Sequence, residues 1–193
     1  HITRLAHGVP VGGALEFLID IGLNQVGLLA GAASGGNTLG YFGINDRHTL
    51  ACPDGNCYNL TNSEVFLTRN IHHFVFNRDY RIDSILFREI IGSVTNAFYF
   101  KPSYFRTFLK ERDWNLGGGA SLVASFACIK EGTPGGRMPL GVEPAVRLAA
   151  SWKETIFLGA DAAVLFPLAG MRYPGQDAPS PAASLRVNAT VVF

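Results

Sequence analysis

Residues 184–191 alternate strictly between polar and apolar side chains, and Phe193 continues the series of apolar positions. The apolar members are Leu185, Val187, Ala189, Val191 and Phe193, and the polar members between them are Ser184, Arg186, Asn188 and Thr190. This period of two predicts a β-strand with one apolar and one polar face. A soluble sheet accepts the same alternation, but a strand that finishes on the last residue of a soluble domain normally frays. We therefore expect a final strand whose two faces meet different environments and whose end is held in place.

The alternation repeats upstream, in residues 115–126, 142–153 and 157–168. Each segment has about ten residues or more, the length that a tilted strand needs to cross a bilayer. One face is apolar throughout, whereas the other carries small or charged residues, which a barrel lumen accepts more readily than a soluble core. Hydrophobic residues make up 48% of the chain, yet no apolar run reaches the roughly 18 residues of a membrane-spanning helix. The sequence predicts an all-β, antiparallel transmembrane β-barrel.

Short and long connections alternate between these segments. Residues 110–113 and 153–155 are short and polar, whereas residues 130–140 and 169–182 are long and rich in turn formers. Outer-membrane barrels combine tight periplasmic turns with longer external loops. With the C-terminus on the periplasmic side, Trp114, Trp152 and Phe193 are expected at the periplasmic membrane interface, where aromatic residues form a girdle.

The N-terminal half gives a less regular pattern. Residues 95–108 alternate except at Arg106, which falls on the apolar face and is explained either by an interfacial position or by a β-bulge. Residues 72–76 are expected to form the preceding strand, and residues 81–91 one short helix with Asp79 near its start. Residues 15–23 and 26–33 form either two strands with a turn at Asn24 and Gln25 or one long strand. The total is about eight strands.

Two stretches carry a resemblance to a known family. Residues 76–99 (FNRDYRIDSILFREIIGSVTNAFY) and 159–170 (GADAAVLFPLAG) resemble an uncharacterised outer-membrane barrel family of myxobacteria and their relatives. The final strand with its terminal Phe also resembles the signal that the barrel-assembly machinery reads. The family's chains are much longer, so the resemblance implies that residues 1–193 are the C-terminal part of one barrel domain; the alternative is a whole barrel. It implies a location in the outer membrane of Gram-negative bacteria and brings no catalytic residues.

Cysteine and histidine residues give two further hypotheses. Cys52 and Cys57 bracket the turn-forming residues 53–56, so a disulfide is expected there, as suits an exported protein; the alternative is two free thiols. Cys128 falls at an apolar strand position and is interpreted as a small hydrophobic residue. The spacing of the Cys and His residues matches no common zinc motif, so we expect neither a metal nor a cofactor.

Six charged residues are expected to face the lumen. They are Lys101, Glu143, Arg147, Lys153, Asp161 and Arg186. Such groups either line a pore and select solutes by charge, or pair with one another across adjacent strands, as Arg147 with Asp161. No nucleophile motif or phosphate-binding loop is present, so an enzyme is not expected. The net charge of +1 argues against a nucleic-acid partner.

Two functions follow from this pattern. The first is a porin-like channel for small polar solutes; the alternative is a structural or interaction barrel whose long outer loops or open edges bind a partner subunit. Strand number separates them, because about eight strands leave no lumen and roughly twelve or more do. The expected partners are outer-membrane lipid, the barrel-assembly machinery, and another chain or a missing segment that closes the wall.

Overall fold

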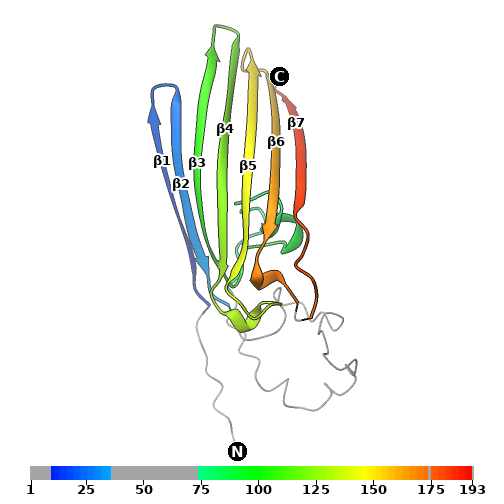
Figure 1. Ribbon diagram of the computed structural model, residues 1–193. Helices are drawn as coiled ribbons and strands as arrows, with labels where there is room; N and C mark the ends of the chain where they lie inside the picture. Colours follow the sequence, from blue (N-terminus) through cyan, green and yellow to red (C-terminus); the bar gives the residue numbers. More distant parts are fainter. Residues whose placement is uncertain (1–9, 36–73, 174, 193) are drawn as a thin grey trace, which may run out of the picture.

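The structure is a computed structural model that describes residues 10–35, 74–173 and 175–192. One antiparallel sheet contains the seven strands of these described residues, and each strand pairs with the next along the chain (Figure 1). The strands are β1 (Gly12–Ile21), β2 (Asn24–Ala33), β3 (Ala97–Lys110), β4 (Trp114–Ala127), β5 (Pro139–Trp152), β6 (Ile156–Pro167) and β7 (Ala182–Val191). In the described residues β1 pairs only with β2 and β7 only with β6, so the sheet is open. The predicted all-β antiparallel fold is confirmed, and closure into a barrel stays a prediction.

Short turns lie at one end of the sheet and long connections at the other (Figure 1). β1 turns into β2 through Gly22 and Leu23, and Gly22 has a φ of 62°, which glycine adopts without strain. The segment therefore forms two strands, and the turn lies at Gly22 and Leu23, two residues before the expected position, because Asn24 and Gln25 already pair with β1. The long connections contain two short 3-10 helices, η3 (Lys130–Gly132) and η4 (Ala169–Met171). Because the strands alternate in direction, β1 and β7 both run towards the short turns.

Residues 74–96 lie on one face of the sheet, near the end with the long connections (Figure 1). They contain a single five-residue π-helix, η2 (Leu86–Ile90), so the helix predicted for residues 81–91 is much shorter. The prediction of a strand at residues 72–76 was wrong for the described residues 74–76. They form only one isolated bridge, between Val75 and Thr95. The described sheet consequently has seven strands where about eight were expected.

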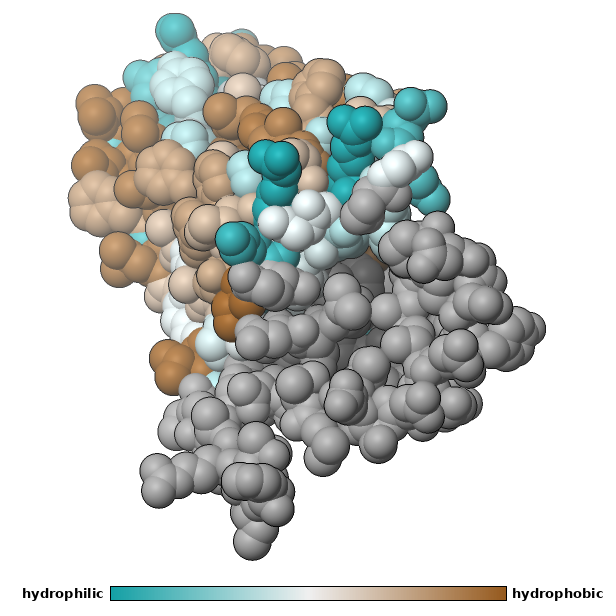
Figure 2. Space-filling model, turned by 60° about the horizontal axis from the view of Figure 1, so that its bottom comes forward, coloured by the Kyte–Doolittle hydropathy of each residue, from teal (hydrophilic) through white to brown (hydrophobic). Residues whose placement is uncertain are grey.

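The alternation of each strand separates an inner face, which contacts residues 74–96, from an outer face. The outer face carries large apolar side chains along all seven strands, among them Phe17, Val26, Phe100, Leu122, Val146, Leu158 and Leu185. Figure 2 shows such apolar side chains crowded together on one side of the described strands. Arg106 lies on this outer face opposite Gly118, and the bulge in β3 comes after it, between Thr107 and Leu109. The bulge therefore does not move Arg106 inwards.

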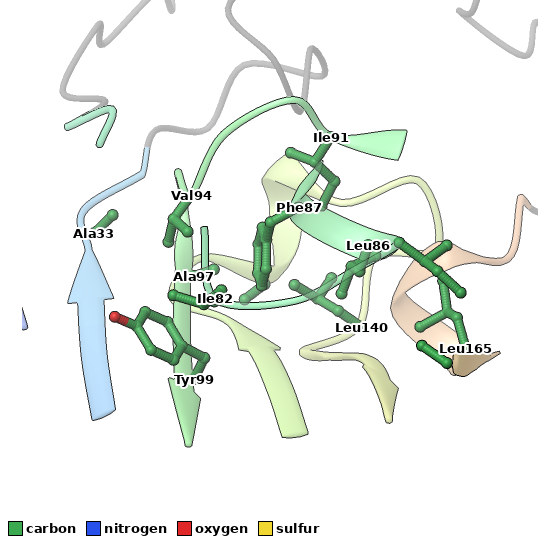
Figure 3. Packing of buried hydrophobic residues seen from close by; sticks show 13 residues of the cluster. Ala33, Ile82, Leu86, Phe87, Ile91, Val94, Ala97, Tyr99, Leu140 and Leu165 are labelled. Atoms are coloured by element: carbon green, nitrogen blue, oxygen red, sulfur yellow. The ribbon is translucent and has the colours of Figure 1, made fainter. Parts of the chain in front are cut away.

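The buried core lies between residues 74–96 and the inner face. Ile82, Leu86 and Phe87 pack against Leu140 of β5 and Leu165 of β6, each no more than a few per cent exposed (Figure 3). These apolar contacts hold residues 82–91, hereafter the inner segment, against the sheet by burying their side chains from water.

Candidate functional site

Three charged side chains from three separate strands bind the inner segment. Lys101 comes from β3, Glu143 from β5 and Arg186 from β7. All three were predicted to face inwards from the alternation of their strands, and the structure places all three on the inner face. They converge on residues 82–89 and form the candidate site.

Glu143 is the most buried of the three, at 2% exposure. Its Oε1 accepts a hydrogen bond from the N–H of Ser84 at 2.7 Å. Its Oε2 accepts from the N–H groups of Ile85, at 3.2 Å, and Leu86, at 3.1 Å. A buried carboxylate is costly unless hydrogen bonds replace its water, and these three donors do so.

Asp83 continues the same pattern from within the inner segment. Its carboxylate accepts from the N–H of Phe87 at 2.8 Å and from the N–H of Arg88 at 3.2 Å. The five consecutive N–H groups from Ser84 to Arg88 are thus shared between two buried carboxylates. Asp79, expected near the helix start, instead donates its own N–H to the side chain of Asn77.

Burial and the neighbouring charge of Glu143 raise the pKa of Asp83 to about 7. The N–H groups of Phe87 and Arg88 and the charge of Lys101 act in the opposite direction, and burial outweighs them. Asp83 therefore carries a proton at acid pH and loses it near neutrality.

Two cations complete the site. Lys101 Nζ donates to the carbonyl oxygen of Ile82 at 2.7 Å. Arg186 Nη2 donates to the carbonyl oxygen of Ser84 at 2.8 Å and to Glu89 Oε1 at 2.7 Å. Arg88 Nε lies 3.6 Å from the same Glu89 oxygen. Side chains of the sheet therefore bind both the backbone N–H groups and the backbone carbonyl oxygens of the inner segment.

A second charged group lies beside this site on the inner face. The strand register sets Asp161 of β6 opposite Arg147 of β5 on one side and Arg186 of β7 on the other. Arg147 Nε is 3.6 Å from Asp161 Oδ1, which is the predicted pairing. The Arg147 side chain is 64% exposed, so the pair is solvated and its contribution to stability is small.

Lys153 is not part of either group. It lies in the turn between β5 and β6, where Lys153 and Glu154 have φ values of 49° and 54°, so the strand alternation has already ended. Its Nζ lies 4.8 Å from the centroid of the Trp152 ring. Trp152 opposes Trp114 with ring centroids 6.5 Å apart, on the outer face beside the short turns.

The remaining predicted residues fall at other places. Cys52, Cys57 and Phe193 lie outside the described residues, so the disulfide stays a prediction. Cys128 lies just beyond the end of β4, and its Sγ is 3.4 Å from the carbonyl oxygen of Ala33. The sequence did not indicate a role for Asp83, although this residue lies within the run of helical spacing that begins at Ile82. It also gave no sign of the hydrogen bond between the hydroxyl groups of Tyr80 and Tyr99.

Among the described residues no cluster of three or more His, Cys, Asp or Glu side chains could hold a metal ion. The helices in this part of the chain are too short or too polar to cross a membrane. No family model, curated protein or solved structure matches the chain. The resemblance to a barrel family stays a prediction.

Proposed function

We propose that the chain forms wall strands of a porin-like β-barrel in the bacterial outer membrane, which passes small polar solutes. The supporting observation is the outer face: apolar side chains remain exposed along every strand, and Leu185 on β7 reaches 75%. Soluble proteins seldom leave an apolar surface of this extent in water, whereas a bilayer covers it.

The distribution of connections supports an orientation for this wall. Trp114 and Trp152 lie on the outer face beside the short turns, where a membrane-interface girdle belongs. The short turns then face the periplasm, and the long connections, together with the inner segment, lie towards the outside.

The open edges call for a further component in this wall. β1 and β7 each have one side without a strand partner in the described residues. Unpaired backbone N–H and C=O groups cost several kcal/mol each in the hydrocarbon region, so an open edge does not persist in lipid. A further segment or another chain therefore supplies the strands that complete the wall. About twelve strands or more in total leave a water-filled lumen.

The charged inner face favours polar solutes for this lumen. Arg147 and Asp161 are solvated on that face, and Arg186 and Glu89 border the inner segment. An inward-folded segment reduces the cross-section available to solutes, which restricts passage to small ones. The alternative is an interaction barrel whose edges or outer loops bind a partner subunit. If few strands complete the wall, the inner segment fills the lumen, and this alternative is favoured over a channel.

Single-channel conductance in a planar bilayer, with the intact mass measured in parallel, tests the proposal. Stable open steps are expected, and Arg147→Glu should shift ion selectivity towards cations because Arg147 faces the lumen. Lys153→Glu reverses the same charge in a turn and should shift it less. Absence of conductance from the protein at its native length would reject the channel and leave the interaction barrel.

A further inference from the structure

Two buried carboxyl groups meet at the start of η2. Asp83 is 8% exposed and Glu143 2%, and their hydrogen bonds go to adjacent stretches of one backbone, residues 84–88. One cation, Lys101, attracts both, and its Nζ also donates to the carbonyl oxygen of Ile82. Two like charges this close in a dry site repel each other strongly, and one bound proton removes that repulsion.

The number of donors indicates which group takes the proton. Glu143 accepts three backbone N–H groups, whereas Asp83 accepts two. Hydrogen bonds from N–H groups stabilise the charged carboxylate, so Glu143 is the better stabilised anion of the two. Asp83 is therefore the proton acceptor. Protonated Asp83 keeps one carbonyl oxygen as an acceptor, so one of the two bonds from Phe87 and Arg88 persists and the other weakens.

Other charged and titratable groups surround the pair on every neighbouring element. They are Tyr99 and Lys101 on β3, Arg147 on β5, Asp161 on β6, Arg186 on β7, and Tyr80, Arg81, Arg88 and Glu89 along the chain near Asp83. Arg147, Asp161 and Glu89 are solvated, which screens their effect on the buried pair.

We propose that Asp83 and Glu143 form a proton-binding site that holds the inner segment against the sheet in acid and loosens it as the pH rises. This inference rests on the proposed channel, because the inner segment narrows the same lumen. Loss of the proton leaves two buried carboxylates with one nearby lysine. Repulsion between the two buried carboxylates then opposes the arrangement that brings them together. The inner segment is consequently held less tightly against the sheet, and the conductance changes.

Amide hydrogen exchange of the purified full chain in detergent micelles tests the site without requiring a channel. After correction for the intrinsic effect of pH on exchange, protection of the Phe87 and Arg88 amides should fall at least tenfold between pH 5 and pH 8. Asp83→Asn does not titrate, so protection should be independent of pH. Its level should lie below that of the native chain at pH 5, because the new NH₂ group faces one of the two N–H donors. Asp79→Asn, at an exposed carboxylate of the same connection, should keep the native pH dependence.

Lys101→Met provides a second test in case Asp83→Asn fails to fold. Removal of the nearby cation makes ionisation of Asp83 harder, so the loss of protection should move to higher pH. Bilayer conductance of the native chain should differ at least twofold between pH 5 and pH 8, and the difference should vanish in Asp83→Asn. Exchange that is independent of pH in the native chain overturns the proton site. Exchange that responds to pH without conductance at any pH supports the proton site and rejects the channel instead.

Discussion

Lys101 on β3 and Arg186 on β7 donate hydrogen bonds to carbonyl oxygens only two residues apart, those of Ile82 and Ser84. Strands β4, β5 and β6 separate them in the sheet. Both side chains reach the same short stretch because the sheet curves around the inner segment. These two hydrogen bonds tie strands from opposite sides of the sheet to one short stretch of backbone. A change in the curvature of the wall would therefore displace the inner segment.

Arginine substitutions on β4 test whether the outer face meets lipid. Leu122 and Leu116 lie on this face at 42% and 41% exposure, Leu122 nearer the middle of the strand and Leu116 near the short turns. Leu122→Arg should lower the free energy of unfolding in lipid by about 2–4 kcal/mol, and Leu116→Arg by about 1 kcal/mol or less. Urea titration of the protein in vesicles measures both. Equal small losses would contradict a membrane location, since exposed positions of soluble proteins tolerate such changes.

Tryptophan fluorescence gives an independent measure of depth. The sequence has two Trp residues, and both lie together on the outer face, as Trp114 and Trp152. Lipids brominated near the headgroup should quench the emission more than lipids brominated near the chain ends, because the pair is placed at the interface. Trp114→Phe, measured beside the native chain, separates the two contributions. Stronger quenching from the chain ends would contradict the interfacial assignment.

Glu143→Gln tests the central contact of the site. The substitution keeps one acceptor oxygen but points an NH₂ donor at backbone N–H groups, so donors are left without acceptors. The free energy of unfolding should fall by about 1–3 kcal/mol, with faster exchange at Ser84, Ile85 and Leu86. Ser121→Ala, on the inner face of β4, is the control and should have little effect. Unchanged exchange at all three amides would show that Glu143 does not hold the inner segment.

Stability should decline as the pH rises towards neutrality. The pKa of Asp83 is raised from 3.8 to about 7, so the folded chain binds a proton that the unfolded chain has already released over this interval. The contribution is fully present below about pH 4 and is lost as the pH passes about 7; three units correspond to at most about 4 kcal/mol. Urea unfolding across this range measures the slope, and Asp83→Asn should flatten it. A rise in stability attributable to Asp83 would contradict the assignment.

The strands and their two faces could be predicted from the sequence. Alternation assigns residues to a face through local geometry alone, so Glu143, Asp161 and Arg186 were placed correctly on the inner face. The same reasoning failed at Lys153, which was counted both as the end of residues 142–153 and as the start of the connection. In the structure it belongs to the turn, where its φ is positive.

The site itself could not be derived in this way. Glu143 accepts from Ile85, which is 58 residues away along the chain, and no local pattern specifies such a partner. The apolar spacing at Ile82, Ile85 and Leu86 is compatible with a helix. In the structure the Glu143 carboxylate binds the N–H groups of residues 84–86 from outside, so the helix begins only at Leu86.

The direction of the edge strands restricts what can close the wall. β1 and β7 run the same way because seven is an odd number of antiparallel strands. An antiparallel neighbour to both must run the opposite way, so a closing piece with only antiparallel seams contributes an odd number of strands. A second copy of the same seven strands, inserted in the same orientation, would instead meet the first along two parallel seams. The direction of the strands at the two seams therefore distinguishes a closing segment from a simple homodimer.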